Sequence, residues 1–195
     1  MPPRGRRPAG GPDTRSAIVA AARELFARQG FERTTMRAVA TRAGVDAALI
    51  HHYFGTKDGL LAAALTPPID PEVLLAGLSR QRERAGHELV RRVLEVWDEH
   101  PVVRGQMLAL VRTALSNEHA TGLLRQALQR TVVVAVRDLA SPDERDLRAA
   151  LVLTQMSGLL LSRYLIQLPG IVDADRGALV DAVGPVLQHY LTGHL

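Results

Sequence analysis

The spacing of apolar residues constrains this chain most, because it is helical from Thr14 onward and Pro and Gly fall between the helical segments. Over residues 14–29, the apolar side chains share one stripe and the charged ones lie outside it. The stripe holds Ile18, Ala21, Ala22, Leu25 and Phe26, and outside it lie Arg15, Arg23, Glu24 and Arg28. The β-branched run 131–136 could form a strand, but its flanks are helical. We therefore predict an all-α chain.

Helix-start and helix-stop residues predict four short N-terminal helices. These are 14–29 ended by Gly30, 34–43 capped by Thr34-Thr35 and ended by Gly44, 46–53 capped by Asp46, and a helix from Lys57 capped by Thr56. Two short helices joined by a tight glycine turn form a helix-turn-helix. A linker follows at Pro67-Pro68 and Asp70-Pro71.

The rest of the chain is predicted to be a helical bundle. Its expected helices are 72–84, 87–99, 102–116, 118–140, 143–167 and 174–192, separated by Gly86, Pro101, Asn117, Ser141-Pro142 and Pro169-Gly170. The expected domains are a disordered basic arm (1–13), a helix-turn-helix domain (14–62) and a helical-bundle domain (63–195).

The excess positive charge is concentrated in the N-terminal part of the chain. Residues 1–60 hold ten basic and five acidic side chains, whereas residues 61–195 hold fourteen and fifteen. A basic N-terminal segment on an otherwise nearly neutral chain suggests a polyanionic partner, either nucleic acid or an anionic membrane surface. A solvated arginine-rich surface would explain the charge equally well, because Arg supplies 23 of the 24 cations along the chain.

The composition indicates the cellular compartment in which the protein is expected to function. The chain has no cysteine, which excludes a disulfide-stapled fold, a zinc ribbon and a cysteine nucleophile. The opening residues lack the apolar run of a signal peptide, and the most apolar stretch, Ala149 to Leu161, is too short to span a bilayer. We expect a cytoplasmic protein without a membrane partner.

The predicted helix 46–53 has two different faces. On a helical wheel, Leu49, Ile50 and Tyr53 cluster on one side and can pack on the preceding helices. The opposite side carries Ala47, Ala48, His51 and His52. Small residues allow a close backbone approach, and imidazoles can donate to phosphates or base edges. This face is either a groove-reading surface or an ordinary surface with two solvated histidines.

Enzyme motifs are poorly represented. His87-Glu88 begins a metalloprotease-like HExxH pattern, but Arg91 stands in place of the second histidine. The sequence contains no GxSxG, P-loop or GxGxxG motif, and its histidines have no i, i+4 spacing that suggests a metal. We expect no enzymatic activity, cofactor or metal.

Residues 34–40 read TTMRAVA, residues 43–45 read AGV, and residues 51–61 read HHYFGTKDGLL. In length and register, these segments resemble the DNA-binding module of the tetracycline-repressor (TetR) family of transcriptional regulators. The resemblance covers about residues 14–62, a quarter of the chain, and the helical remainder also suits that family.

The resemblance implies a role for several residues. Thr35 and Met36 would open a helix that holds a phosphate, and Ala47 and Ala48 would read base edges. His51, His52 and Tyr53 would contact phosphates, and Lys57, the only lysine, would clamp one. With alanines in the base-reading positions, thymine methyl contacts, water and DNA shape would carry much of the specificity.

The sequence departs from the family pattern at three positions. The family often has an acidic residue at the position of Ala38, often Ser at that of Asp46, and usually Tyr at that of His51. Ala38 removes the reciprocal capping box, and Asp46 is expected to cap its helix rather than contact phosphate. His51 suggests that DNA binding depends on pH, because a protonated imidazole adds a cation.

The last two predicted helices suggest a dimer. Residues 143–167 are apolar around most of the helix, which requires burial on two sides. A core helix of a monomer would fit as well. In the resembled family, helices in these places form a four-helix dimer interface. The implied interface residues are Leu153, Leu160, Leu161, Val183 and Leu187.

The resemblance also implies a small-molecule pocket in the bundle. Its candidate residues are Trp97, Met107, Arg112, Met156 and Tyr164. Core packing would explain the Trp and Met residues, and ion pairs would explain Arg112 and Arg163. The resulting hypothesis is a homodimeric, ligand-responsive repressor that binds double-stranded DNA. The alternative is a helical bundle that binds lipids, small molecules or protein partners without a DNA function.

Overall fold

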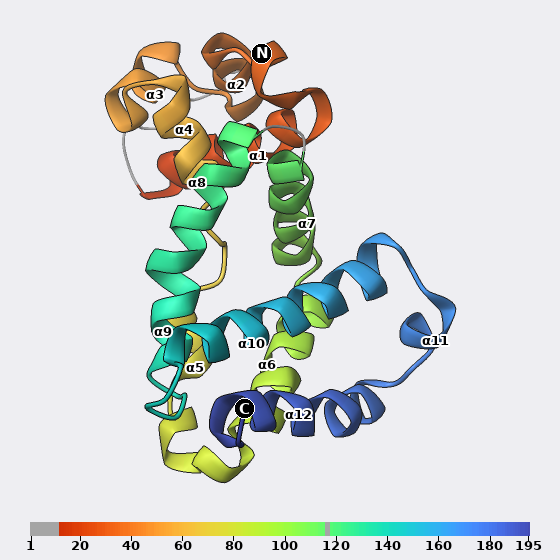
Figure 1. Ribbon diagram of the computed structural model, residues 1–195. Helices are drawn as coiled ribbons and strands as arrows, with labels where there is room; N and C mark the ends of the chain where they lie inside the picture. Colours follow the sequence, from red (N-terminus) through yellow and green to blue (C-terminus); the bar gives the residue numbers. More distant parts are fainter. Residues whose placement is uncertain (1–11, 116–117) are drawn as a thin grey trace. The chain divides into compact units, whose positions relative to one another are not determined.

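The computed structural model describes residues 12–115 and 118–195, and every regular element in these ranges is a helix (Figure 1). The all-α prediction is confirmed, including a helical conformation for the β-branched run 131–136. Most of the predicted arm 1–13 and the predicted break at Asn117 lie outside the described residues. Within the described ranges, none of the helices combines the length and the apolar character needed to cross a membrane.

The chain forms two compact units. The first extends to Thr66 and also takes in Ala109–Leu124, and the second comprises Pro67–Leu108 and Arg125–Leu195. This division differs from the one drawn at residues 62–63, because Leu110 and Ala120 are buried in the core of the first unit. The boundary therefore falls within two helices, α7 (Pro101–Leu115) and α8 (Glu118–Leu128).

Four N-terminal helices build most of the first unit. They are α1 (Pro12–Arg33), α2 (Met36–Ala43), α3 (Ala47–Phe54) and α4 (Lys57–Ala64). The predicted stop at Gly30 is a kink with φ 78°, after which α1 continues for three residues. Gly44 has φ 69° and caps α2, so the glycine turn between α2 and α3 forms as predicted. Ile18, Phe26, Val39, Ile50 and Leu60 are buried where these helices meet.

Arg23 on α1 is buried, although the sequence pattern placed it on the solvent side. Only 9% of the residue is exposed, and its Nε donates to the Ala64 carbonyl at 2.8 Å. A second donor of the guanidinium reaches the Thr66 carbonyl. Carbonyls at a helix C-terminus lack partners within the helix. Arg23 therefore caps the end of α4 from α1, and burial lowers its pKa.

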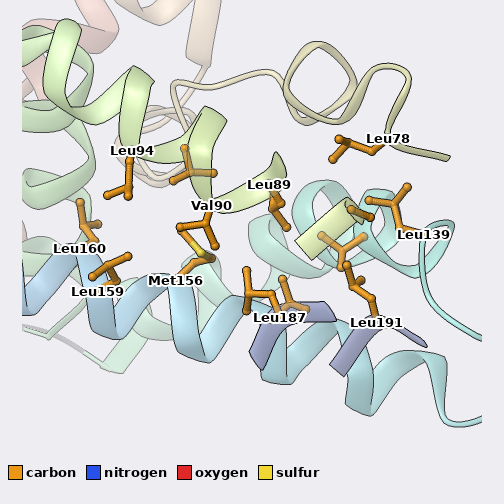
Figure 2. Close-up of a cluster of buried hydrophobic side chains, with 14 of the residues drawn as sticks. Leu78, Leu89, Val90, Leu94, Leu139, Met156, Leu159, Leu160, Leu187 and Leu191 are labelled. Carbon is orange, nitrogen blue, oxygen red and sulfur yellow. The ribbon is translucent and has the colours of Figure 1, made fainter. Parts of the chain in front are cut away.

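The second unit contains the remaining helices around one apolar core. They are α5 (Pro71–Leu75), the 3-10 helix η1 (Leu78–Arg84), α6 (Ala85–Glu99), the π-helix η2 (Gln129–Val133), α9 (Val134–Arg137), α10 (Arg145–Leu160), the π-helix η3 (Leu161–Leu165), α11 (Pro169–Val172) and α12 (Arg176–Thr192). Figure 2 shows the core, where Leu89 and Leu94 of α6 face Met156 of α10 and Leu187 of α12.

Several predicted boundaries in this unit are wrong. Gly77, with φ 76°, divides the predicted helix 72–84 into α5 and η1. The predicted helices 118–140 and 143–167 each contain a π-helical turn. The predicted break at Pro169-Gly170 is the start of the short helix α11, because Pro is well tolerated in a first helical turn.

Gly86 lies inside α6 and does not separate two helices. It is buried against α12, and a Cβ added at Gly86 would lie 2.3 Å from the backbone N of Gln188 and 2.5 Å from the Gly184 carbonyl oxygen. The Gly86 N–H donates to the Gln188 side chain at 2.9 Å. The absence of a side chain lets the two backbones approach, and among the helices of residues 12–115 and 118–195 the contact between α6 and α12 is the most extensive.

Arg148 fixes the start of α10 to the end of α12. It is 1% exposed and donates to the carbonyls of Asp143, Tyr190 and Gly193, each at 2.9 Å. It also forms a salt bridge with the Asp143 carboxylate, which lowers the pKa of that carboxyl. The bonds to Tyr190 and Gly193 satisfy carbonyls at the C-terminal end of α12 that have no partner within the helix.

A methyl group at Gly86 should weaken the second unit. We expect Gly86→Ala to reduce the free energy of unfolding by about 1–3 kcal/mol, because α6 and α12 must separate. The matched control is Gly105→Ala on α7, where an added Cβ meets nothing within 4 Å. This control should gain up to about 1 kcal/mol from helix propensity. Urea unfolding of both variants gives the comparison, and equal effects would contradict the close-approach explanation.

Candidate functional site

Helix α3 buries one face and exposes the other, as the wheel predicted. Ile50 is fully buried in the core of the first unit, and Leu49 and Tyr53 are half-buried. On the opposite face, Ala48, His51 and His52 are exposed, and Ala47 is half-buried. The His52 ring packs edge-on against Tyr53, with 5.4 Å between ring centroids. A surface of two small side chains and two imidazoles is therefore available to a ligand.

The N-termini of α2 and α3 are both capped by side chains. Thr35 Oγ1 accepts from the Ala38 N–H at 3.1 Å, and Asp46 Oδ1 accepts from the Ala48 N–H at 2.8 Å. Met36, the first residue of α2, is half-buried. The predicted caps are thus both formed. Each cap satisfies one of the free N–H groups of a first turn and leaves others that can bind an anion.

The imidazole of His51 is oriented by the turn after α3. Its Nδ1 lies 3.1 Å from the Gly55 carbonyl oxygen, an acceptor, so Nδ1 carries the proton in this contact. In the neutral ring, the outward Nε2 is then an acceptor, like a phosphate oxygen. Protonation converts Nε2 into a charged donor. The geometry therefore makes an anion contact by His51 depend on its protonation.

The side chain of Lys57 contacts residues at the C-terminal end of α1. Its Nζ lies 4.2 Å from the centroid of the Phe31 ring and donates to the Glu32 carbonyl at 3.2 Å. An ammonium has three donors, so these contacts orient Lys57 and still leave donors for a phosphate. The neighbouring Asp58 pairs with His119 of α8 at 2.9 Å. Sequence analysis missed this pair, because residues 61 positions apart carry no local signal.

Ion pairs also connect α1 to the helix-turn-helix. Glu24 of α1 forms salt bridges with Arg42 of α2 and with Arg28. The hydrogen bond from Arg42 is the main reason that the pKa of the Glu24 carboxyl is lowered. Arg15 lies over the Phe54 ring at the end of α3, 5.3 Å from its centroid. These contacts hold α2 and α3 on the α1 scaffold and leave the exposed face of α3 unobstructed within this unit.

The second unit contains a cavity of about 100 Å³. All of its lining residues are apolar, and they come from seven helices and from the segment that precedes α5. Those used below are Leu74 of α5, Leu89, Val93 and Trp97 of α6, Met107 of α7, Val132 of η2, and Val152, Leu153 and Met156 of α10. Three predicted pocket residues, Trp97, Met107 and Met156, thus line one cavity. The other lining residues are Pro, Ile, Leu and Val, which nothing in the sequence distinguishes from ordinary core and turn residues.

Arg92 holds the helix α5 that forms part of the cavity wall. Its Nη1 donates to the carbonyls of Leu74 at 2.9 Å and Ala76 at 2.8 Å, and Glu88 accepts from its Nε at 2.8 Å. Glu88 also pairs with Arg91, whose hydrogen bond is the main cause of the low pKa of Glu88, about 2. An α5 of only five residues depends on such tertiary contacts.

Two predicted pocket residues do not line the cavity. Arg112 is an exposed residue of α7 that belongs to the first unit. Tyr164 packs edge-on against Trp97, and its hydroxyl donates to Asp98 at 2.5 Å. Burial, followed by the bond to Asp98, raises the pKa of Tyr164 to about 12. Arg163 bonds the carbonyls of Ile171 and Ala174 and pairs with Asp98, in line with the ion-pair explanation.

Two of the predicted interface residues are wrong. Leu160 is 2% exposed and Leu187 is fully buried in the core of a single chain, so neither offers a surface to a partner. Leu153 lines the cavity, and Leu161 and Val183 are half-buried. Other side chains form an exposed, largely apolar face on the neighbouring helices α10 and α12. They are Leu147, Ala150, Thr154 and Gly158 on α10, and Ala178, Ala182, Pro185 and Val186 on α12.

Comparison with known proteins identifies two matching family models. The model of bacterial regulatory proteins of the tetR family matches residues 18–64, which contain α2, α3 and α4. The model of the tetracyclin repressor-like C-terminal domain matches residues 83–191. The second match alone spans more than half of the chain.

Individual proteins give the same result. A solved structure of a TetR-family regulator from Streptomyces coelicolor A3 is 33% identical, has a TM-score of 0.68, and is matched over 96% of this chain and 99% of that one. The HTH-type transcriptional regulator BetI of Rhizobium meliloti (strain 1021) is 28% identical over 91% of each chain. The HTH-type transcriptional repressor Rv3405c of Mycobacterium tuberculosis is 34% identical over 51% of this chain and 55% of its own.

Proposed function

Because this chain belongs to the tetR family and is a helix-turn-helix transcriptional regulator, we propose that it represses transcription by binding a pseudo-palindromic operator as a homodimer. A small molecule bound in the second unit releases it. The observation that carries the proposal is the exposed face of α3, with Ala48, His51 and His52 opposite the buried Ile50. We assign this activity to the bacterial cytoplasm, and catalysis is no part of it.

Each residue of the proposed interface has a physical role. Thr35 and Met36 present the first turn of α2 to a phosphate, where free N–H groups and the helix dipole attract an anion. The methyl groups of Ala47 and Ala48 contact thymine methyls. His51, His52, Tyr53 and Lys57 donate to phosphates on either side. Phosphate contacts provide most of the affinity, and DNA shape adds to the specificity.

Binding to random duplex pools tests the DNA activity. The purified protein should select a pseudo-palindromic sequence, and its affinity should fall by about 10³–10⁵ between 50 and 200 mM salt if it contacts six to ten phosphates. Lys57→Ala should weaken binding to all sequences, whereas Ala48→Ser should change the preferred bases. The matched control is Arg130→Ala, an exposed cation of the second unit. Weak, salt-insensitive binding would instead favour the alternative of a bundle without a DNA function.

Affinity for the selected operator should also depend on pH. Protonation turns Nε2 of His51 into a charged donor, so affinity should rise about tenfold for two copies in a dimer as the pH is lowered. His51→Gln should weaken this dependence and leave only the part due to His52, and His119→Gln, which removes the partner of Asp58, is the control. An equal pH dependence in His51→Gln and the wild type, measured at constant salt, would contradict the role of His51.

The exposed face of α10 and α12 supports the dimer. It is formed by small and apolar residues, which allow two helix pairs to pack closely in a four-helix arrangement. Leu147 is 50% and Val186 36% exposed, so this face has apolar surface that a second copy would bury. A two-fold axis would bring the same face of a second copy against it. Paired α3 helices would then reach successive major grooves about 34–36 Å apart.

Charges on this face should dissociate the dimer. We expect the double variant Leu147→Glu and Val186→Glu to be monomeric in analytical ultracentrifugation, with dimer affinity at least about 100-fold lower, since carboxylates would be buried without partners. Val102→Glu changes an apolar residue of α7 that is 71% exposed, and it should remain dimeric. A wild-type protein that sediments as a monomer at micromolar concentration would refute the dimer.

A further inference from the structure

The cavity of the second unit has walls without charge. Its side chains come only from Pro, Ile, Leu, Val, Met and Trp, and the polar side-chain atom among them is Nε1 of Trp97. This nitrogen is buried and has no hydrogen-bond partner among the described residues. Figure 2 shows two of the lining side chains, Leu89 and Met156, among the hydrocarbon of the surrounding core.

A charged group in this cavity would lose its hydration and gain no counter-ion. The charged side chains close to the wall have partners elsewhere. Arg92 bonds two carbonyls and Glu88, and Asp98 is held by Tyr164, Arg163 and Arg176. Transfer of an unpaired charge into an apolar environment is strongly unfavourable, whereas transfer of hydrocarbon is favourable. The walls therefore favour neutral, apolar groups over both cations and anions.

The volume limits the size of the group that the cavity accepts. Apolar cavities of about 150 Å³ remain dry and bind benzene or xenon, so about 100 Å³ limits the inserted group to about one small ring or a branched alkyl group. Met107 and Met156 lie on the wall, and their flexible side chains can adapt to different shapes. Val132 belongs to the π-helix η2, a conformation that is frequent at functional sites.

We propose that the effector inserts an uncharged hydrocarbon group of about one ring into this cavity, and that cationic and anionic ligands are excluded from it. This inference rests on the proposed function, because it assigns a chemical class to the small molecule that the regulator senses. The hydrocarbon part of the effector contacts the lining residues Trp97, Met107, Val132 and Met156.

Three probes of equal size but different charge test the proposal: toluene, benzylammonium and benzoate. Trp97 is the only tryptophan and lines the cavity, so its fluorescence reports occupancy directly. Toluene should change the Trp97 emission in a saturable manner. The two ions should bind at least about 100-fold more weakly, because each would be buried without a partner. Equal or tighter binding of either ion, or no saturable effect of toluene, would overturn the proposal.

Two phenylalanine substitutions locate the binding to the cavity. Val132→Phe places a ring in the cavity and should lower the affinity for toluene at least about tenfold. Val134→Phe is the matched control, because Val134 lies two residues away, is 48% exposed and does not line the cavity. Unchanged toluene binding in Val132→Phe, with a normal thermal transition, would place the ligand elsewhere. The comparison of the three probes on the wild type does not depend on either variant.

Operator binding by the same wild-type samples separates this inference from the function on which it rests. If the protein binds its operator and only the charged probes bind the second unit, the hydrocarbon assignment fails and the regulatory function remains. If toluene binds but no duplex is selected from a random pool, the cavity assignment holds and the DNA function fails. If toluene binds and lowers operator affinity, both are supported.

Discussion

The first unit depends on mutual burial of helices that are too short to be stable alone. Helices α2, α3 and α4 have eight residues each, well below the length at which an isolated helix persists in water. Packing around Ile18, Phe26 and Ile50 stabilises them together, and side-chain caps at Thr35, Asp46 and Thr56 satisfy their first turns. One consequence is that α3 is held by its inner face, and Ala48, His51 and His52 on its outer face stay exposed.

The second unit combines tight and loose packing. At Gly86 the backbones of α6 and α12 approach so closely that a methyl group would not fit, and Arg148 fixes the end of α12. Near Trp97 the same helix α6 borders a cavity. Protein interiors are close-packed, so an apolar cavity beside such a tight crossing forfeits dispersion contacts that a filled core would gain. A core that must accept a ligand lacks these dispersion contacts as long as the cavity is empty.

Local signals predicted the first unit well and the second unit partly. Glycines with positive φ and hydroxyl or carboxylate caps act within a few residues, so the limits of α2 and α3 could be read from the sequence. Arg23, Gly86 and Leu187 were misjudged because their environment includes residues from other helices that lie far away in the sequence. A buried arginine resembles a surface arginine on a helical wheel, and a packing glycine resembles a helix stop. The resemblance and the residue types pointed to Trp97, Met107 and Met156 as pocket candidates, and all three line the cavity. Nothing in the sequence distinguishes Leu74 and Val132, which also line it, from core residues.

Continuity of two helices connects the cavity with the first unit. On α7, Met107 lines the cavity, and Leu110, less than one turn further, is buried in the core of the first unit. On α8, Leu124 packs on that core and Leu128, one turn further, lines the cavity. An α-helix transmits a displacement along its axis because each turn is hydrogen-bonded to the next. Met107 and Leu128 thus lie on helices that also contribute residues to the first unit. A coupling of about 1–3 kcal/mol between ligand and DNA would be enough for regulation.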